Sequence, residues 1–130
     1  MYEKTTRGIK VTVQPQFLEG QSRPDDNKFV WAYTIVIENL GDETVMLSTR
    51  HWIISDANGL KQEVRGDGVV GERPTLKPGD SFQYTSGCPL STASGIMVGS
   101  YNMINTSGDS FDVSVPAFSL DSPYDRHSVN

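Results

Sequence analysis

The chain is 130 residues long, 36% hydrophobic and 21% charged, with a formal net charge of −5. This composition is that of a folded protein and excludes a disordered chain, and the length suits one domain over 1–130. Sixteen acidic against eleven basic residues argue against nucleic acid as a partner, because neutralising phosphates requires clustered Lys and Arg.

Two features of the sequence concern the cellular compartment. Residues 1–13 lack the apolar stretch of a signal peptide, and no window approaches the roughly 20 apolar residues that span a bilayer. Cys88 is the single cysteine, so the chain forms no internal disulfide. We therefore expect a cytoplasmic protein without membrane insertion.

The first third of the chain predicts two strands. Ile9, Val11 and Val13 alternate with polar residues, which is typical of a half-buried strand. A polar loop follows over 19–28. Residues 29–37 then carry large apolar side chains on one face and smaller apolar ones on the other, which predicts a strand in the middle of a sheet.

The central third predicts a hairpin. A third apolar run covers 45–55, and its alternation slips near Arg50 and His51, where a bulge is one explanation. Asn58-Gly59 favours a type I′ turn, because both residues tolerate positive φ, and this turn leads into a strand over 60–65.

The last third predicts further short strands separated by turns. Pro78-Gly79 suits a type II turn. The predicted strands after it contain Phe82 and Tyr84, then Met97, Gly99, Tyr101 and Met103, and finally Phe111, Val113, Val115, Phe118 and Leu120. A loop is expected over 86–94, the ordered core over about 5–120, and a mobile polar tail over 121–130.

Six or seven short strands with frequent turns indicate an all-β fold, an antiparallel β-sandwich of the immunoglobulin or fibronectin type III kind. The segment 76–82 resembles the stretch before the tyrosine corner of fibronectin type III domains. It departs from that pattern because Phe82 stands where the tyrosine is expected, and Phe82 has no hydroxyl.

Residues 66–71 match G-x-G-x-x-G, with glycines at Gly66, Gly68 and Gly71. A dinucleotide site needs a helix directly after this motif, and the prolines at 74 and 78 argue against one. Two readings stay open. Successive amides could form an anion-binding nest between Arg65 and Arg73, or the glycines could serve only the geometry of a tight loop.

The sequence gives little support for a catalytic site or a metal site. His51 beside Arg50 could act as a base or an anion contact, but a bulge with both side chains satisfied locally is favoured. Cys88 is expected to be an exposed or half-buried structural thiol, and His51 is the one base that folding could bring to it. His127 lies in the tail, and no metal-ligand spacing occurs. We expect no catalytic residue, no metal and no cofactor.

Several separate motifs carry a family resemblance. They are Arg50-His51-Trp52, Asp56-Ala57-Asn58-Gly59, the run from Val64 to Pro74, Pro78-Gly79, the run from Phe82 to Cys88, and the run from Gly99 to Met103. Their order and spacing resemble the ApaG family over nearly the whole chain.

The resemblance to the ApaG family implies a fibronectin type III-like sandwich. It also implies a small standalone bacterial protein, and an interaction module like the related domains of F-box and polymerase delta-interacting proteins. The bacterial family is associated with cobalt resistance and magnesium efflux, a role that would be indirect for a chain without a membrane span.

Our first hypothesis is a non-catalytic module that binds a protein partner. Its expected surface is a rim formed by Arg50, His51, Arg65, the loop 66–71 and Arg73, with a free sheet edge as an alternative. The second hypothesis is a sensor of a phosphate or pyrophosphate-type ligand that uses the same glycine loop.

Overall fold

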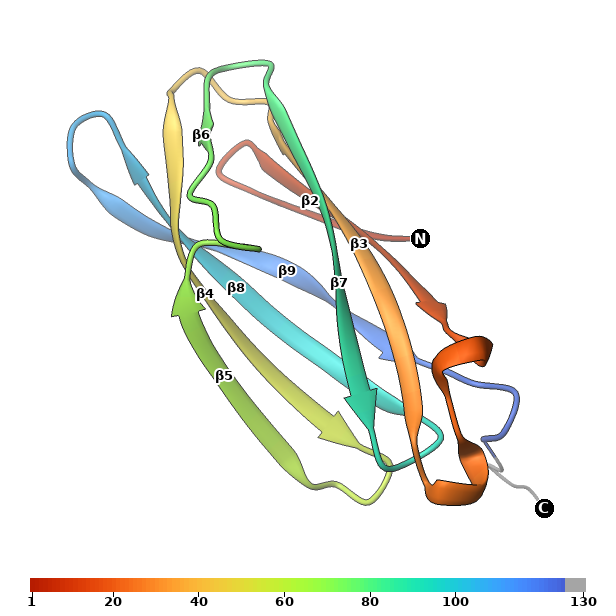
Figure 1. Cartoon of the computed structure of the whole chain (residues 1–130). Coiled ribbons are helices and arrows are strands. Elements are labelled where there is room, and N and C mark those ends of the chain that lie inside the picture. The colour runs from red at the N-terminus through yellow and green to blue at the C-terminus, as the bar shows by residue number, and fades with distance from the viewer. Residues whose placement is uncertain (126–130) are drawn as a thin grey trace.

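A computed structural model describes residues 1–125, which form two antiparallel β-sheets packed face to face (Figure 1). One sheet has the order β1-β2-β3-β7, with β1 at Tyr2–Thr6, β2 at Ile9–Phe17, β3 at Phe29–Asn39 and β7 at Ser81–Leu90. The other has the order β5-β4-β8-β9, with β4 at Val45–Asp56, β5 at Lys61–Asp67, β8 at Gly95–Asn105 and β9 at Ser110–Leu120. The short β6, Thr75–Leu76, also pairs with β4.

The all-β sandwich predicted from the sequence is confirmed. Within residues 1–125 there is no α-helix, only the 3₁₀ turns η1 (Glu19–Gln21) and η2 (Pro24–Asp26). No helix in this part of the chain is long and apolar enough to cross a membrane.

The core lies between the sheets and follows from the alternation of the strands. Every second residue of β3 from Phe29 to Ile37 is buried, and β3 lies between β2 and β7 as predicted. From the opposite sheet, the Trp52 ring packs edge-on against Tyr33 and Phe118, with centroid separations of 5.6 and 6.0 Å. Each of these large side chains stabilises the fold by about 1.5–3 kcal/mol when fully buried.

Several local predictions were wrong in detail. The bulge in β4 lies between Leu47 and Thr49, just before the predicted position. The 58–59 hairpin is present, but only Gly59 has positive φ, and the Asp56 carboxylate accepts hydrogen bonds from the amides of Asn58 and Leu60. The turn is therefore a type I turn followed by a left-handed glycine.

Other strands are longer than the sequence predicts. β7 continues to Leu90 through the expected loop, and β1 precedes the first predicted strand. The Pro78-Gly79 turn agrees with type II, since Gly79 has φ +92°. Part of the predicted tail is held in place, because the Trp31 indole donates to the carbonyl of Asp121. Residues 126–130, including His127, lie outside the described residues.

The sandwich is closed along one side and open along the other. On the closed side β1 and β2 contact β9, and the Tyr2 hydroxyl lies 2.9 Å from Ser119 Oγ. On the other side β7 and β5 are edge strands, and no strand within residues 1–125 pairs with the outer edge of either (Figure 1). This open side is where side chains between the sheets can be reached from solvent.

Candidate functional site

A cleft runs along the open side between β5 and β7. We call it the edge cleft and define it by Tyr33, Arg50, Trp52, Val64, Ser86 and Cys88, which line its main hollow of about 250 Å³. A second hollow of about 160 Å³ continues past Arg50 and is bounded by Val69, Val70 and Tyr84. Arg50 therefore stands between the two hollows, at the middle of the cleft.

The Arg50 side chain points between the sheets because it shares the inward parity of Trp52 and Ile54 on β4. Its Nη1 donates to the backbone carbonyls of Asp67 and Gly68, each at 3.0 Å. The guanidinium lies against the backbone of Gly66, its partner on β5. A Cβ at position 66 would come within 2.7 Å of Cζ and of both Nη atoms. Gly66 thus provides the space in which the guanidinium lies.

The glycine-rich loop closes one end of the edge cleft. Val69 is 1% exposed and inserts into the core, and the amides of Val69 and Glu72 each donate to the other residue's carbonyl at 2.8 Å. The two residues between them, Val70 and Gly71, have φ of +44° and +81°, the signs of a type I′ turn. A β-branched valine is a strained choice at the first of these positions.

Gly68 is also required by close packing. A Cβ on Gly68 would lie 2.2 Å from the carbonyl oxygen of Glu72, and the Gly68 amide donates to the carbonyl of Ser48. The amides of Gly68, Val69 and Glu72 are therefore engaged with backbone carbonyls, which leaves them unable to cradle an anion.

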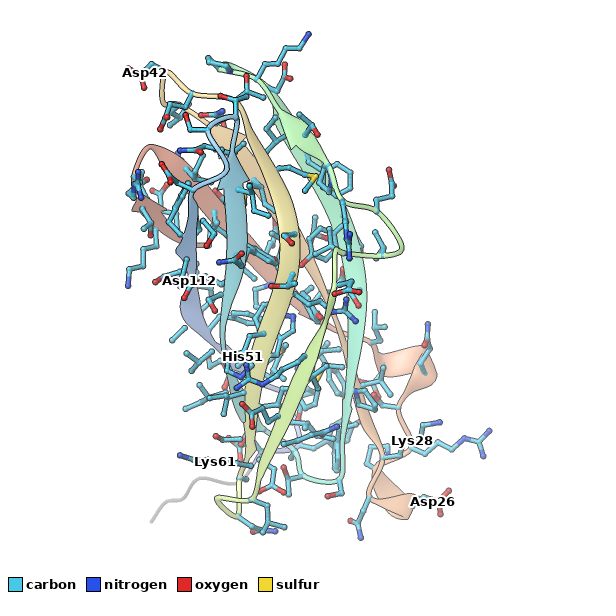
Figure 2. All side chains as sticks on the ribbon, turned by 90° about the vertical axis from the view of Figure 1, so that its left-hand side faces the viewer. Asp26, Lys28, Asp42, His51, Lys61 and Asp112 are labelled. Carbon is cyan, nitrogen blue, oxygen red and sulfur yellow. The ribbon has the colours of Figure 1, made fainter. Side chains whose placement is uncertain are left out.

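The remaining residues of the predicted rim lie on the outer face of the β5-β4-β8-β9 sheet. His51 Nε2 lies 2.6 Å from Glu63 Oε2, and Arg65 Nη2 donates to the same oxygen at 2.9 Å. Figure 2, which looks onto this side of the molecule, shows His51 over the middle of the sheet. These contacts hold the pKa of Glu63 below its ordinary value, first through the His51 hydrogen bond and then through the charge of Arg65.

Arg73 is engaged separately, because its Nη2 pairs with Asp67 Oδ2 at 3.1 Å. The structure thus joins His51 and Arg65 through Glu63, and both line a shallow hollow of about 340 Å³ that Arg50 also borders. Arg73 is separate from this cluster. The Arg50 side chain lies between the sheets, whereas His51, Arg65 and Arg73 contact carboxylates at the surface.

Neutral hydroxyl and thiol groups surround Arg50. The hydroxyls of Tyr84 and Tyr101 lie 2.5 Å apart in the core, and burial raises the pKa of both. Burial also raises the pKa of Tyr33, whose hydroxyl is hydrogen-bonded to Ser86. These groups stay protonated at neutral pH and contribute dipoles, not charge, to the cleft.

Cys88 is buried at 3% exposed and lies within β7, so the expected exposed or half-buried thiol in a loop was wrong. The physical reason is the alternation of β7, which points Tyr84, Ser86 and Cys88 toward the core. Burial raises the Cys88 pKa to about 11. His51 lies on the outer face of the other sheet with Glu63 as its partner, so it is not placed as a base for this thiol.

Residues 1–125 contain no group of three or more His, Cys, Asp or Glu side chains that could hold a metal ion. The sequence reasoning included Val70 through the loop 66–71 but missed Tyr33 and Ser86 as residues of the cleft. Strand parity could have identified Arg50 as inward-facing, since Arg50, Trp52 and Ile54 alternate in one phase after the bulge.

Known proteins match this chain closely. The ApaG domain family matches residues 19–105. The ApaG protein of Rhodospirillum centenum is 59% identical and that of Brucella anthropi 58% identical, each over the whole of both chains. A crystal structure of a Bordetella pertussis protein described as ApaA superposes with a TM-score of 0.87 and 44% identity, covering 90% of this chain and 95% of that one. The chain belongs to the ApaG family.

Proposed function

We propose that this protein is a non-catalytic interaction module that binds an extended segment of a protein partner along the edge cleft, as a strand added to β7. The observation that carries the proposal is the open side of the sandwich. There an unpaired sheet edge runs beside a cleft that reaches a half-buried arginine. An exposed sheet edge offers backbone donors and acceptors to an extended peptide, and neighbouring hollows supply side-chain selectivity.

The two edges of the open side differ in how well they are protected against strand addition. β5 has four charged residues among its seven, at Lys61, Glu63, Arg65 and Asp67. Charged side chains on an edge strand oppose pairing with another chain. β7 has ten residues and no charged side chain, and its outward-facing Gln83 and Thr85 are small or neutral. The edge of β7 is therefore the one suited to a partner strand.

The chemistry of the cleft supports binding over catalysis. A nucleophilic cysteine acts as the thiolate, and a pKa of about 11 keeps Cys88 protonated at neutral pH. The raised pKa values of Tyr33 and Tyr84 likewise keep both hydroxyls neutral. A general base near pH 7 would need the opposite tuning.

Phosphate or pyrophosphate binding at the loop 66–71 stays a prediction, and the geometry favours it less. Three loop amides donate to carbonyls, and the flanking Arg65 and Arg73 pair with Glu63 and Asp67. A cytoplasmic location stays a prediction, which rests on Cys88 being the single cysteine and so unable to form an internal disulfide. The association with cobalt resistance and magnesium efflux that the family resemblance implies would then act through the partner.

The test uses peptides selected on the wild-type protein from a displayed library of random sequences. Their affinities are measured for wild type, for the double variant Gln83→Lys/Thr85→Lys, and for Thr5→Lys. Both altered positions of β7 are exposed, and the change removes the surface hydrogen bond between Thr85 and Thr34. The lysines oppose strand pairing at that edge, and thermal unfolding of the variant checks that it is folded.

Thr5→Lys is the matched control, because it places the same lysine at an exposed position of β1, the edge strand on the closed side. We expect binding to wild type and Thr5→Lys and loss of binding to the β7 variant. Peptides that bind all three proteins equally would remove the β7 edge as the site.

A further inference from the structure

We infer that the partner segment carries an Asp or Glu whose carboxylate pairs with the guanidinium of Arg50 inside the edge cleft. This inference rests on the proposed function and names the chemistry of the partner. It follows from the hydrogen bonds that fix Arg50, from its lack of a carboxylate partner, and from the exposed Val70 beside it.

Arg50 is held in place but only partly satisfied. A guanidinium has five N–H donors, and the two on Nη1 are directed to the carbonyls of Asp67 and Gly68. Within residues 1–125, Nη2 and Nε have no hydrogen-bond acceptor and no carboxylate within salt-bridge distance. Three donors on a fixed, planar group therefore stay available for a ligand.

Arg50 lacks a carboxylate partner although acidic residues are close by, and the neighbouring arginines show this. Glu63 pairs with Arg65 and with His51, and the Asp67 carboxylate pairs with Arg73. Asp67 contacts Arg50 only through its backbone carbonyl. Nearby carboxylates are thus directed to the solvent-facing cations, and the inward-facing cation is left without a counter-charge.

The surroundings of Arg50 strengthen an interaction with an anion. Its guanidinium is half-buried and lies near the neutral hydroxyls of Tyr33, Tyr84 and Tyr101. Partial removal from water raises the electrostatic attraction between a guanidinium and a carboxylate. Two parallel N–H···O bonds from a fixed guanidinium also match the planar geometry of a carboxylate.

Val70 adds an apolar contact at the same place. It borders the hollow next to Arg50, it is 54% exposed, and its φ is +44°. Asn or Gly would fit this turn position without strain, whereas a β-branched residue there costs about 1–2 kcal/mol. A strained, exposed valine beside the free guanidinium points to a contact with an apolar side chain next to the acidic one.

A carboxylate fits this site better than a phosphate. A phosphate monoester or diphosphate carries about two or more charges and needs several donors around it. Here Arg65 and Arg73 pair with carboxylates, and the amides of Gly68, Val69 and Glu72 donate to carbonyls. A single guanidinium edge suits a single carboxylate.

The experiment uses peptides selected from the displayed random library, in which each acidic residue is replaced by its amide. Affinities are measured against wild type, Arg50→Gln, Arg50→Lys and Gly66→Ala. Gly66→Ala keeps the arginine but displaces its guanidinium, because the new Cβ would stand 2.7 Å from it. Thermal unfolding of each variant confirms that it is folded.

We expect selected peptides to share one acidic residue, and replacing it by its amide to weaken binding by about tenfold to a hundredfold. Arg50→Gln should weaken binding of the acidic peptide by the same factor and leave the affinity for the amide peptide unchanged. The affinity of Arg50→Lys for the acidic peptide should lie between those of wild type and Arg50→Gln, since lysine keeps the charge and loses the bidentate geometry of the guanidinium. Gly66→Ala should also reduce binding of the acidic peptide only.

The outcomes separate the two proposals. Peptides that bind at the β7 edge with no acidic residue in common, and with affinities that Arg50→Gln leaves unchanged, would overturn this inference and leave the proposed function standing. Failure of every peptide to bind in the cleft would overturn the proposed function itself. Inorganic pyrophosphate is titrated in parallel, with the Arg50 Nε–H resonance as readout. A pyrophosphate shift without one from acidic peptides would overturn the carboxylate assignment.

Discussion

Arg50 and Gly66 face one another across the β4–β5 pair, and the guanidinium of one occupies the space that a side chain on the other would fill. From this position Arg50 donates to the carbonyls of Asp67 and Gly68 and ties the glycine-rich loop to β4. A glycine in a motif that resembles a nucleotide fingerprint therefore serves the placement of an arginine.

The packing of Arg50 against Gly66 predicts that Gly66→Ala changes the free energy of unfolding in opposite directions in the wild-type and Arg50→Ala backgrounds. Gly66→Ala alone should lower the free energy of unfolding by about 1–2 kcal/mol, because the displaced guanidinium loses its two carbonyl contacts. In an Arg50→Ala background the same change should raise it by roughly 0.5 kcal/mol, since alanine is favoured over glycine within a strand. Urea unfolding of the four proteins measures both effects. Equal costs of Gly66→Ala in the two backgrounds would contradict the packing described here.

Val70→Asn should stabilise the fold. Asparagine adopts positive φ more readily than valine, so the turn between Val69 and Glu72 should gain about 1 kcal/mol in the free energy of unfolding. The measurement is urea unfolding, and Val70→Ile is the control because it keeps the β-branch and the strain. A loss of stability in Val70→Asn would show that the valine contributes packing that outweighs its backbone conformation.

The fold could be predicted from the sequence to a large extent because strand alternation is a local property. Ile9, Val11 and Val13 and the inward face of 29–37 are buried as the alternation indicates. β1 was missed because Tyr2–Thr6 is a mostly polar strand, half-buried at its two ends, that pairs with β2 at the edge. The length of β7 was missed because Gly87 and Pro89 are typical of loops. Both are tolerated at an edge strand.

The candidate site was predicted only in part, because its geometry depends on pairing between distant segments. Arg50, His51, Arg65 and Arg73 were expected to form one rim at an end of the sandwich. Strand parity instead sends Arg50 inward and His51 and Arg65 outward, and Arg73 lies in the connection between β5 and β6. No local sequence pattern predicts that Asp67 pairs with Arg73, or that Gly66 lies opposite Arg50. That register is set by the β4–β5 hairpin and by the bulge between Leu47 and Thr49.

The His51–Glu63 contact predicts a pH-dependent contribution to stability. The pKa of Glu63 is lowered in the folded protein, so its contribution is fully present above the ordinary glutamate pKa and is lost as pH falls through the lowered value. Glu63→Gln should therefore be less stable than wild type at neutral pH, and the difference should vanish in strong acid. Unfolding measured across that range checks this. A difference that stays constant with pH would show that the charge of Glu63 has no part in it.

Cys88 should react slowly with a disulfide reagent in the native protein. The thiol is 3% exposed and its pKa is raised to about 11, so little thiolate is present or reachable at neutral pH. We expect labelling to be limited by opening of the fold and to become fast in denaturant. The same reagent on unfolded protein is the control. Rapid labelling of the native protein would mean that β7 opens readily from its sheet.

The most direct test of partner binding is residue-resolved amide hydrogen exchange on the free protein and on its complex with a selected peptide. If the segment pairs with the edge of β7, the amides of β7 that point away from β3 should become protected on binding. Those of β1 and of the outer-face cluster of His51, Glu63 and Arg65 should stay as they were. New protection at that cluster, with β7 unchanged, would contradict the account.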